Sequence, residues 1–288
     1  INHHLVFSDK SFAQFYKISV NFHKYRLTNI EYSKKICIID LEGGISMYSN
    51  LYIKEIMINK PNSFEYPFNI PSILNTDNLK IDTPVTFFVG ENGSGKSTLI
   101  EALAVSMGFN PEGGSRNMVF STQDTHSQLS NYLTIAKRGY PKDGFFLRAE
   151  SFYNVASYIQ QIDNGIASSD LQNVYGGSLH ECSHGESFLK LLSNRLFGQG
   201  LYILDEPEAA LSVQKLFQML CIMKELVDNN SQFIIATHSP ILLAYPESTI
   251  YQFSDDGIES VEYKNTQQYT MTKNFLDNPE RMLRLLFE

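Results

Sequence analysis

The sequence is poor in several features that define other classes of protein. Its three cysteines are widely spaced and odd in number (Cys37, Cys182 and Cys221), so neither a disulfide framework nor a zinc site is indicated. No apolar run reaches the ~18 residues that a membrane-spanning helix requires. The sequence contains no internal repeat and no coiled-coil heptads. We therefore expect a globular chain without a membrane span, in the reducing environment of the cytoplasm.

Basic residues are also scarce. The chain has 23 Lys and Arg against 31 Asp and Glu, a net charge of −8. This balance argues against a strongly basic nucleic-acid surface but leaves a local basic patch possible. Bulk charge therefore does not support nucleic acid as a partner. With 43% hydrophobic residues in 288, the chain can bury one large or two modest cores.

The first 46 residues differ from the rest of the chain. They contain no proline and hold six basic and four acidic residues. At the junction, Glu42-Gly43-Gly44 can be encoded by DNA containing GGAGG, a bacterial ribosome-binding sequence, and Ile45-Ser46 would be the spacer before a start at Met47. We hypothesise that 1–46 is translated upstream DNA and that 47–288 is a single domain. The alternative is a genuine N-terminal extension, which an upstream peptide in the native protein would establish.

A glycine-rich stretch, Gly90–Thr98, lies between the apolar run Val85–Val89 and the helix-favouring run Leu99–Ala104. This strand–loop–helix context is that of a phosphate-binding P-loop. Glycines let backbone N–H groups converge on an anion, and the N-terminus of the following helix adds partial positive charge. The expected nucleotide-binding residues are Gly90, Asn92, Gly93, Ser94, Gly95, Lys96, Ser97 and Thr98. Within this set, Lys96 would reach the β- and γ-phosphates, and the Ser97 hydroxyl would ligate Mg²⁺.

Two further apolar runs end in chemically active side chains. The run 201–204 is followed by Asp205 and Glu206, and the run 233–236 is followed by Thr237 and His238. An Asp at the end of a buried strand is placed as a second Mg²⁺ contact in P-loop enzymes. A neighbouring Glu can accept a proton from water. We expect His238 at the same strand edge, where ligands bind in such sheets.

Hydrophobic patterning predicts strands that alternate with helices, and hence a parallel sheet covered on both faces. The apolar face of the last helix predicts packing, either on its own domain or on a partner. Besides the elements above, we expect a strand at 51–58, loops with a short strand over 64–82, a helix near 129–136, a strand at 144–150 leading into a helix at 152–162, a loop at 163–178, helices at 185–197 and 212–228, a hairpin over 250–263 and a helix near 279–287.

Together these motifs resemble the ABC-type P-loop ATPase family, in particular its soluble SMC/RecF-like branch and the bacterial stand-alone AAA/ABC-like ATPases. Gly90–Thr98 resembles the Walker A motif, and 201–208 resembles Walker B with its catalytic glutamate. The segment 182–186 resembles the family signature, 209–212 lies where the D-loop falls, and His238 matches the switch histidine. The resemblance covers about 51–263. It implies an α/β fold with a mostly parallel central sheet, helices on both faces, an antiparallel β part and a helical signature region.

The resemblance also implies roles. Asp205 and Ser97 would hold Mg²⁺, and Glu206 would be the catalytic base, assisted by His238 and Lys96. Two copies would form a homodimer around two ATP molecules, and each would face the signature residues of the other, namely Ser183, His184, Gly185 and Glu186. Cys182 and His184 depart from the family pattern of Leu and Gly.

Two positions are less well defined by the family pattern. Order along the chain makes Glu150 the Q-loop candidate, in place of the usual glutamine, and Gln123 is the rival. For stacking on the adenine, Phe68 and Tyr66 are candidates, although either can instead belong to the core.

The biological role is open between three readings. The first is an ATP-driven switch in DNA maintenance or phage defence that works with an unidentified effector protein. The second is the nucleotide-binding subunit of an ABC transporter. The third, a P-loop kinase or GTPase, is disfavoured because Asn59–Asn62 ends in Asn and no guanine-reading Asn-Lys-x-Asp motif is present.

Overall fold

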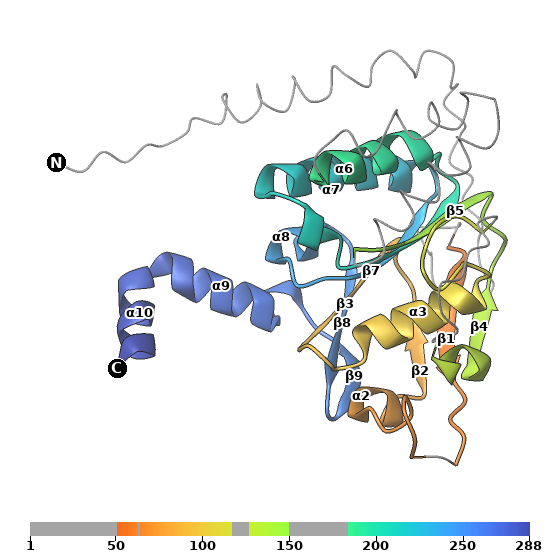
Figure 1. Ribbon diagram of the computed structural model, residues 1–288, viewed down its shortest axis with the longest axis horizontal. Coiled ribbons are helices and arrows are strands. Elements are labelled where there is room, and N and C mark those ends of the chain that lie inside the picture. The colour runs from red at the N-terminus through yellow and green to blue at the C-terminus, as the bar shows by residue number, and fades with distance from the viewer. Residues whose placement is uncertain (1–50, 63, 117–126, 150–183) are drawn as a thin grey trace, which may run out of the picture. The chain divides into compact units, whose positions relative to one another are not determined.

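The structure, a computed structural model, describes residues 51–62, 64–116, 127–149 and 184–288. These belong to one of the two units into which the chain divides, 50–288 (Figure 1). Several predictions lie outside the described residues and stay predictions: the Met47 start, the helix at 152–162, the loop at 163–178, Gln123, Glu150 and Ser183.

A six-stranded sheet forms the centre of the described unit, with strand order β5-β6-β7-β3-β8-β9. Its first five strands run parallel, and β9 pairs antiparallel with β8. The parallel strands read as continuous apolar runs because both of their faces are covered. The predicted α/β fold class and the predicted hairpin are therefore confirmed. The bounds are β3 (Val85–Gly90), β5 (Asp143–Arg148), β6 (Gly200–Asp205), β7 (Gln232–Ala236), β8 (Thr249–Ser254) and β9 (Gly257–Ser260).

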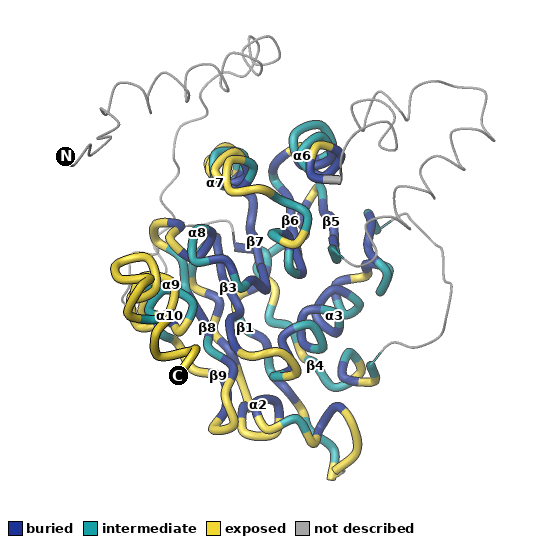
Figure 2. The backbone as a smooth tube through the Cα atoms, turned by 60° about the vertical axis from the view of Figure 1, so that its left-hand side comes forward, coloured by how far each residue is buried: buried dark blue, intermediate teal, exposed yellow. Residues whose placement is uncertain are grey.

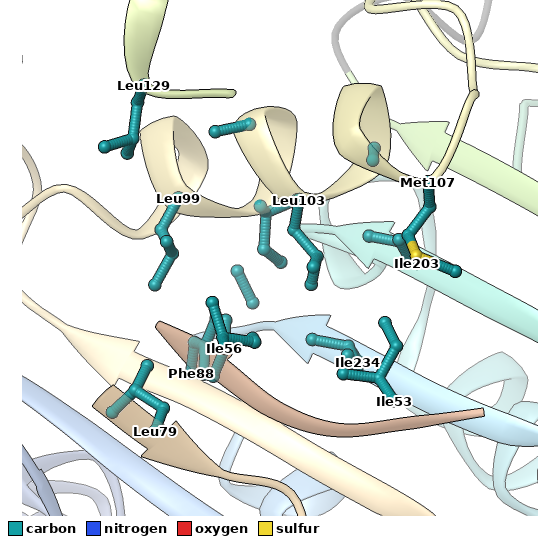
Figure 3. Close-up of a cluster of buried hydrophobic side chains, with 14 of the residues drawn as sticks. Ile53, Ile56, Leu79, Phe88, Leu99, Leu103, Met107, Leu129, Ile203 and Ile234 are labelled. Atoms are coloured by element: carbon teal, nitrogen blue, oxygen red, sulfur yellow. The ribbon is translucent and has the colours of Figure 1, made fainter. Parts of the chain in front are cut away.

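Two hydrophobic cores lie on opposite faces of this sheet. Alternate side chains of each strand point to opposite faces, so Phe87 and Tyr202 enter one core while Phe88 and Ile203 enter the other. The first core is closed by helices α6 (His184–Arg195), α7 (Val213–Asp228) and α8 (Pro240–Leu243). Helix α3 (Lys96–Ser106) covers the second core, which Figure 3 shows from the side.

A second, antiparallel sheet contributes to the core under α3. Its order is β2-β1-β4, with bounds β1 (Ile53–Ile58), β2 (Asn78–Lys80) and β4 (Leu133–Lys137). Ile53 and Ile56 of β1 and Leu79 of β2 pack in the same core as Leu99 and Leu103 of α3 (Figure 3). The P-loop helix is thus held by both sheets.

The buried side-chain amide of Gln232 is one link between the two sheets. The Gln232 side chain, at the start of β7, is fully buried. Its Oε1 accepts hydrogen bonds from the backbone N–H groups of Tyr52 and Ile53, both at 2.9 Å, and its Nε2 donates to the Ile53 carbonyl, also at 2.9 Å. This one side chain therefore hydrogen-bonds three backbone groups at the start of β1, where Ile53 also pairs with Lys137 of β4.

We expect Gln232→Ala to be strongly destabilising. The substitution removes the hydrogen-bond partner of the Tyr52 and Ile53 N–H groups and of the Ile53 carbonyl, and a buried group left unpaired costs about 1–3 kcal/mol. The free energy of unfolding, measured by urea denaturation, should fall by about 3 kcal/mol or more. Gln218→Ala, on an exposed turn of α7, is the matched control and should change it little. Equal effects of the two substitutions would contradict this role.

The remaining described elements are short or peripheral. The predicted helix near 129–136 is wrong: a 3₁₀ turn, η1 (Gln128–Tyr132), leads into β4, because the alternating Leu133 and Ile135 pair with β1. The short strand within 64–82 is confirmed as β2, and α2 (Pro71–Leu74) was not predicted. The others are η2 (Pro207–Ala210), η3 (Tyr263–Asn265), α9 (Gln267–Asp277) and α10 (Pro279–Phe287).

The predicted terminal helix is present as α10, preceded by α9, which was not predicted. No residue of either helix is buried. Figure 2 shows both helices in the colours of exposed and intermediate residues, in contrast to the buried sheet. Leu285 and Leu286 are 65% and 69% exposed.

Candidate functional site

The carboxyl ends of three parallel strands meet at one edge of the central sheet. In the strand register, Ala236 of β7 lies opposite Phe88 of β3 on one side and opposite Asp205 of β6 on the other. The loops that continue from these strands carry the P-loop, Glu206 and His238. The structure thus brings the three predicted motifs together, although they come from distant parts of the sequence.

The P-loop turn needs glycine at two crowded positions. Gly90 has φ +150°, and a Cβ there would lie 2.8 Å from the Phe253 carbonyl oxygen. Gly95 has φ +97°, and a Cβ there would lie 3.0 Å from Cγ2 of Ile70. A side chain at either position would meet both steric contact and backbone strain. Gly95 caps helix α3, which begins at Lys96, so the N–H groups at the start of this helix face the loop.

Lys96 is folded back onto the turn that precedes it. Its ammonium donates hydrogen bonds to the carbonyl oxygens of Gly90 at 2.9 Å and Glu91 at 2.7 Å. The residue is only 4% exposed, and this burial lowers the pKa of the Lys96 ammonium, while the carboxylates of Glu206, Asp205 and Glu208 act in the opposite direction. A buried cation is therefore held beside three acidic residues at the loop.

Ser97 and Asp205 form an oxygen pair beside Lys96. The Ser97 hydroxyl donates to Asp205 Oδ1 at 3.1 Å. A hydroxyl and a carboxylate are hard oxygen ligands of the kind that Mg²⁺ prefers. Among the described residues no group of three or more His, Cys, Asp or Glu could hold a metal by itself. The pair therefore fits a Mg²⁺ ion that takes its other ligands from substrate phosphates and water.

Glu206 and His238 form the second pair at this edge. Directly after β6, Glu206 adopts a left-handed conformation with φ 51°, an uncommon backbone state for a residue with a side chain. Oε1 of Glu206 lies 3.6 Å from Nε2 of His238. That nitrogen is buried and has no hydrogen-bond partner within the described parts of the chain. The Glu206 side chain is 43% exposed, so water can reach its carboxylate.

Two residues that the sequence analysis missed contact this site. Arg148, at the end of β5, pairs with Glu101 of α3 at 2.6 Å, and its Nε lies 3.7 Å from Asp205 Oδ2. Glu208, in η2, accepts a hydrogen bond from the backbone N–H of His238. The position of Arg148 at the end of a predicted strand was a usable signal. No comparable signal marked Glu208, since its partner is a backbone group in the loop after β7, a segment distant in the sequence.

The signature segment is described only from the start of α6. His184, Gly185 and Glu186 form its first turn. A Cβ on Gly185 would lie 2.6 Å from the Ala210 carbonyl oxygen and 2.9 Å from Lys215 Nζ. Gly185 thus packs against the segment that follows Glu206 in the same chain, and a side chain would not fit there.

The two candidate aromatic residues are in different environments. Phe68 is 3% exposed and packs edge-on against Tyr132, with ring centroids 4.9 Å apart. Tyr66 is 64% exposed, and its hydroxyl lies 3.2 Å from the Thr98 hydroxyl. Phe68 therefore belongs to the core, whereas Tyr66 lies at the surface beside the P-loop helix.

Comparison with known families identifies two matching regions. Residues 66–178 match a family described as "AAA domain", and residues 185–244 match one described as "AAA domain, putative AbiEii toxin, Type IV TA system". The first region includes Lys96, and the second includes Asp205, Glu206 and His238. No curated protein matches the sequence significantly. These two matches agree with the predicted resemblance to P-loop ATPases.

Two solved structures illustrate what this chain is similar to. One is cbiO1 from Clostridium perfringens, described as part of the ABC transporter complex cbiONQ, at 17% identity and a TM-score of 0.46 over 82% of this chain and 99% of that one. Another is the SMC head domain from Thermotoga maritima, at 16% identity and a TM-score of 0.41 over 74% of this chain and 100% of that one. Of the helices that the structure describes, none has both the length and the apolar character to cross a membrane.

Proposed function

We propose that this chain, whose fold is that of the P-loop ATPases, binds ATP with Mg²⁺ at the edge formed by β3, β6 and β7 and hydrolyses it to ADP and phosphate. One observation carries the proposal: a buried lysine, a hydroxyl–carboxylate pair and a Glu–His pair meet at one sheet edge. Each supplies a different part of phosphoryl transfer to water.

The residues divide the chemistry as follows. The P-loop N–H groups and Lys96 bind the phosphates and stabilise charge on the transferring group. Ser97 and Asp205 hold Mg²⁺, which would neutralise phosphate charge when bound. Glu206 accepts a proton from the attacking water. His238, whose Nε2 lies 3.6 Å from Oε1 of Glu206, helps to position this water. Lys96 leaves its two carbonyl partners when it turns to the phosphates.

The second half of each site is proposed to come from a second copy. The signature residues Ser183, His184, Gly185 and Glu186 would contact the nucleotide bound to the partner, so ATP would hold the homodimer together. Within one chain, Gly185 packs against Ala210, so the start of α6 lies next to the segment that follows Glu206. Glu150 would be the Q-loop residue.

The biological role is proposed to be an ATP-driven switch in phage defence or DNA maintenance, acting in the cytoplasm on an unidentified effector. The family match over 185–244, whose description includes a putative toxin of a type IV toxin–antitoxin system, supports defence over the other readings. Nucleic acid binding gains no support from the net charge of −8.

A direct assay tests the core of this proposal. The purified chain should release phosphate from ATP in the presence of Mg²⁺ and not in EDTA. Light scattering after size-exclusion chromatography should show the mass double when ATP and Mg²⁺ are added. A chain that neither binds nor hydrolyses ATP would overturn the function, and a monomer at saturating ATP would overturn the shared site.

A further inference from the structure

We propose that Glu208 is a positioning residue that holds the loop after β7 and thereby sets the His238 imidazole beside Glu206. The structural part of this inference stands on the contacts of Glu208 alone. Its consequence for turnover rests on the proposed function.

The central contact joins a side chain of η2, the turn after β6, to the backbone of the loop after β7. Glu208 lies in η2, three residues after Asp205, and its Oε1 accepts a hydrogen bond from the backbone N–H of His238 at 2.5 Å. A hydrogen bond from an N–H to an ionised carboxylate is about twice as strong as a neutral one. The loop that carries the proposed switch histidine is therefore bound directly to the segment that follows the proposed base.

The neighbouring backbone groups have other partners. Thr237 donates its N–H to the Phe88 carbonyl at 3.1 Å, and Ser239 donates its N–H to the Thr237 hydroxyl at 3.0 Å. Of these three consecutive N–H groups, the outer two donate to a carbonyl and to a hydroxyl, whereas that of His238 donates to a carboxylate. Removal of that acceptor leaves the residues on either side bonded while the backbone at His238 itself is released.

The surroundings of the Glu208 carboxylate suit a residue that holds the loop after β7 and do not suit one that transfers protons. Its Oε2 is buried and has no hydrogen-bond partner among the described residues, and its Oε1 is held by His238 N–H. Glu206, by contrast, keeps a side chain that is 43% exposed and can meet water. Glu208 is also close enough to Lys96 for its charge to act on that ammonium. One carboxylate thus influences both the switch loop and the P-loop lysine.

The same short segment contacts the signature helix. Within η2 and its end, Leu211 donates its N–H to the Glu208 carbonyl at 3.0 Å, and the Ala210 carbonyl lies against Gly185 of α6. Glu208 is therefore close to the P-loop, to the loop that carries His238 and to the start of α6. A displacement of η2 would change the packing of all three segments.

The test combines a spectroscopic readout with kinetics. The chain has seven histidines, so labelling with ¹⁵N-histidine gives a simple NMR spectrum of backbone amides. The His238 amide signal is assigned by its loss in His238→Asn. In Glu208→Gln, which keeps an oxygen acceptor but loses the charge, the His238 amide proton should move upfield. In Glu208→Ala it should move further. Glu259→Gln, an equal charge loss at an exposed position of β9, is the control and should leave the signal in place.

Turnover should follow the same order. We expect kcat for ATP to fall roughly tenfold in Glu208→Gln and about 100-fold in Glu208→Ala, as for small misplacements of a catalytic group, with KM little changed. An unshifted His238 amide in both folded variants would overturn the contact, and unchanged kcat beside a shifted amide would overturn the positioning role. If the wild-type chain hydrolyses no ATP, the proposed function fails, while the amide shift still decides whether Glu208 holds the loop.

Discussion

Glu206→Gln should reduce kcat for ATP hydrolysis by about 10²–10⁴-fold, the usual contribution of a positioned general base, while ATP still binds. Glutamine keeps the size and the left-handed backbone of the position but cannot accept the proton from water. ATP should then persist in the site and trap the dimer. Phosphate release measures the first effect, and light scattering with ATP and Mg²⁺ measures the second.

The matched control is Glu262→Gln, which removes one exposed carboxylate away from the site. It should hydrolyse ATP at the wild-type rate and dimerise only transiently. A Glu206→Gln variant that turns over ATP normally would exclude Glu206 as the base. A variant that stays monomeric with bound ATP would instead exclude the shared dimeric site.

Lys96→Met should weaken ATP binding by roughly 100-fold, because hydrogen bonds from a charged donor contribute about 1.5–3 kcal/mol each and about 1.4 kcal/mol corresponds to a factor of ten. Fluorescent-nucleotide titration with Mg²⁺ measures the dissociation constant. Hydrolysis should be lost together with binding.

The substitution should not unfold the protein. Burial already disfavours the charged form of Lys96, as its lowered pKa indicates, and methionine fills a similar volume without a charge. Lys54→Met, at an exposed position of β1, is the control and should bind ATP normally. Unchanged ATP affinity in a folded Lys96→Met would show that the nucleotide does not bind at this loop.

The strand ends that carry chemically distinctive residues lie next to one another in the structure, as their sequence pattern predicts. Lys96, Asp205 and His238 follow apolar runs, and the carboxyl ends of parallel strands necessarily meet at one sheet edge. Their proximity could therefore be predicted without coordinates. The roles assigned to them remain proposals.

Structure that depends on distant partners cannot be predicted from the local sequence. The sequence predicts a helix near 129–136, but pairing with β1 makes 133–137 a strand. Glu208 and Gln232 were missed for a related reason. Each satisfies backbone groups of a distant segment, and such a contact leaves no periodicity in the sequence.

The two cores on opposite faces of the central sheet separate the supports of the site. The P-loop helix α3 rests on one core, and α6, which starts with the signature residues, rests on the other. A packing defect confined to one of the two layers should therefore disturb the support of α3 or that of α6, but not both.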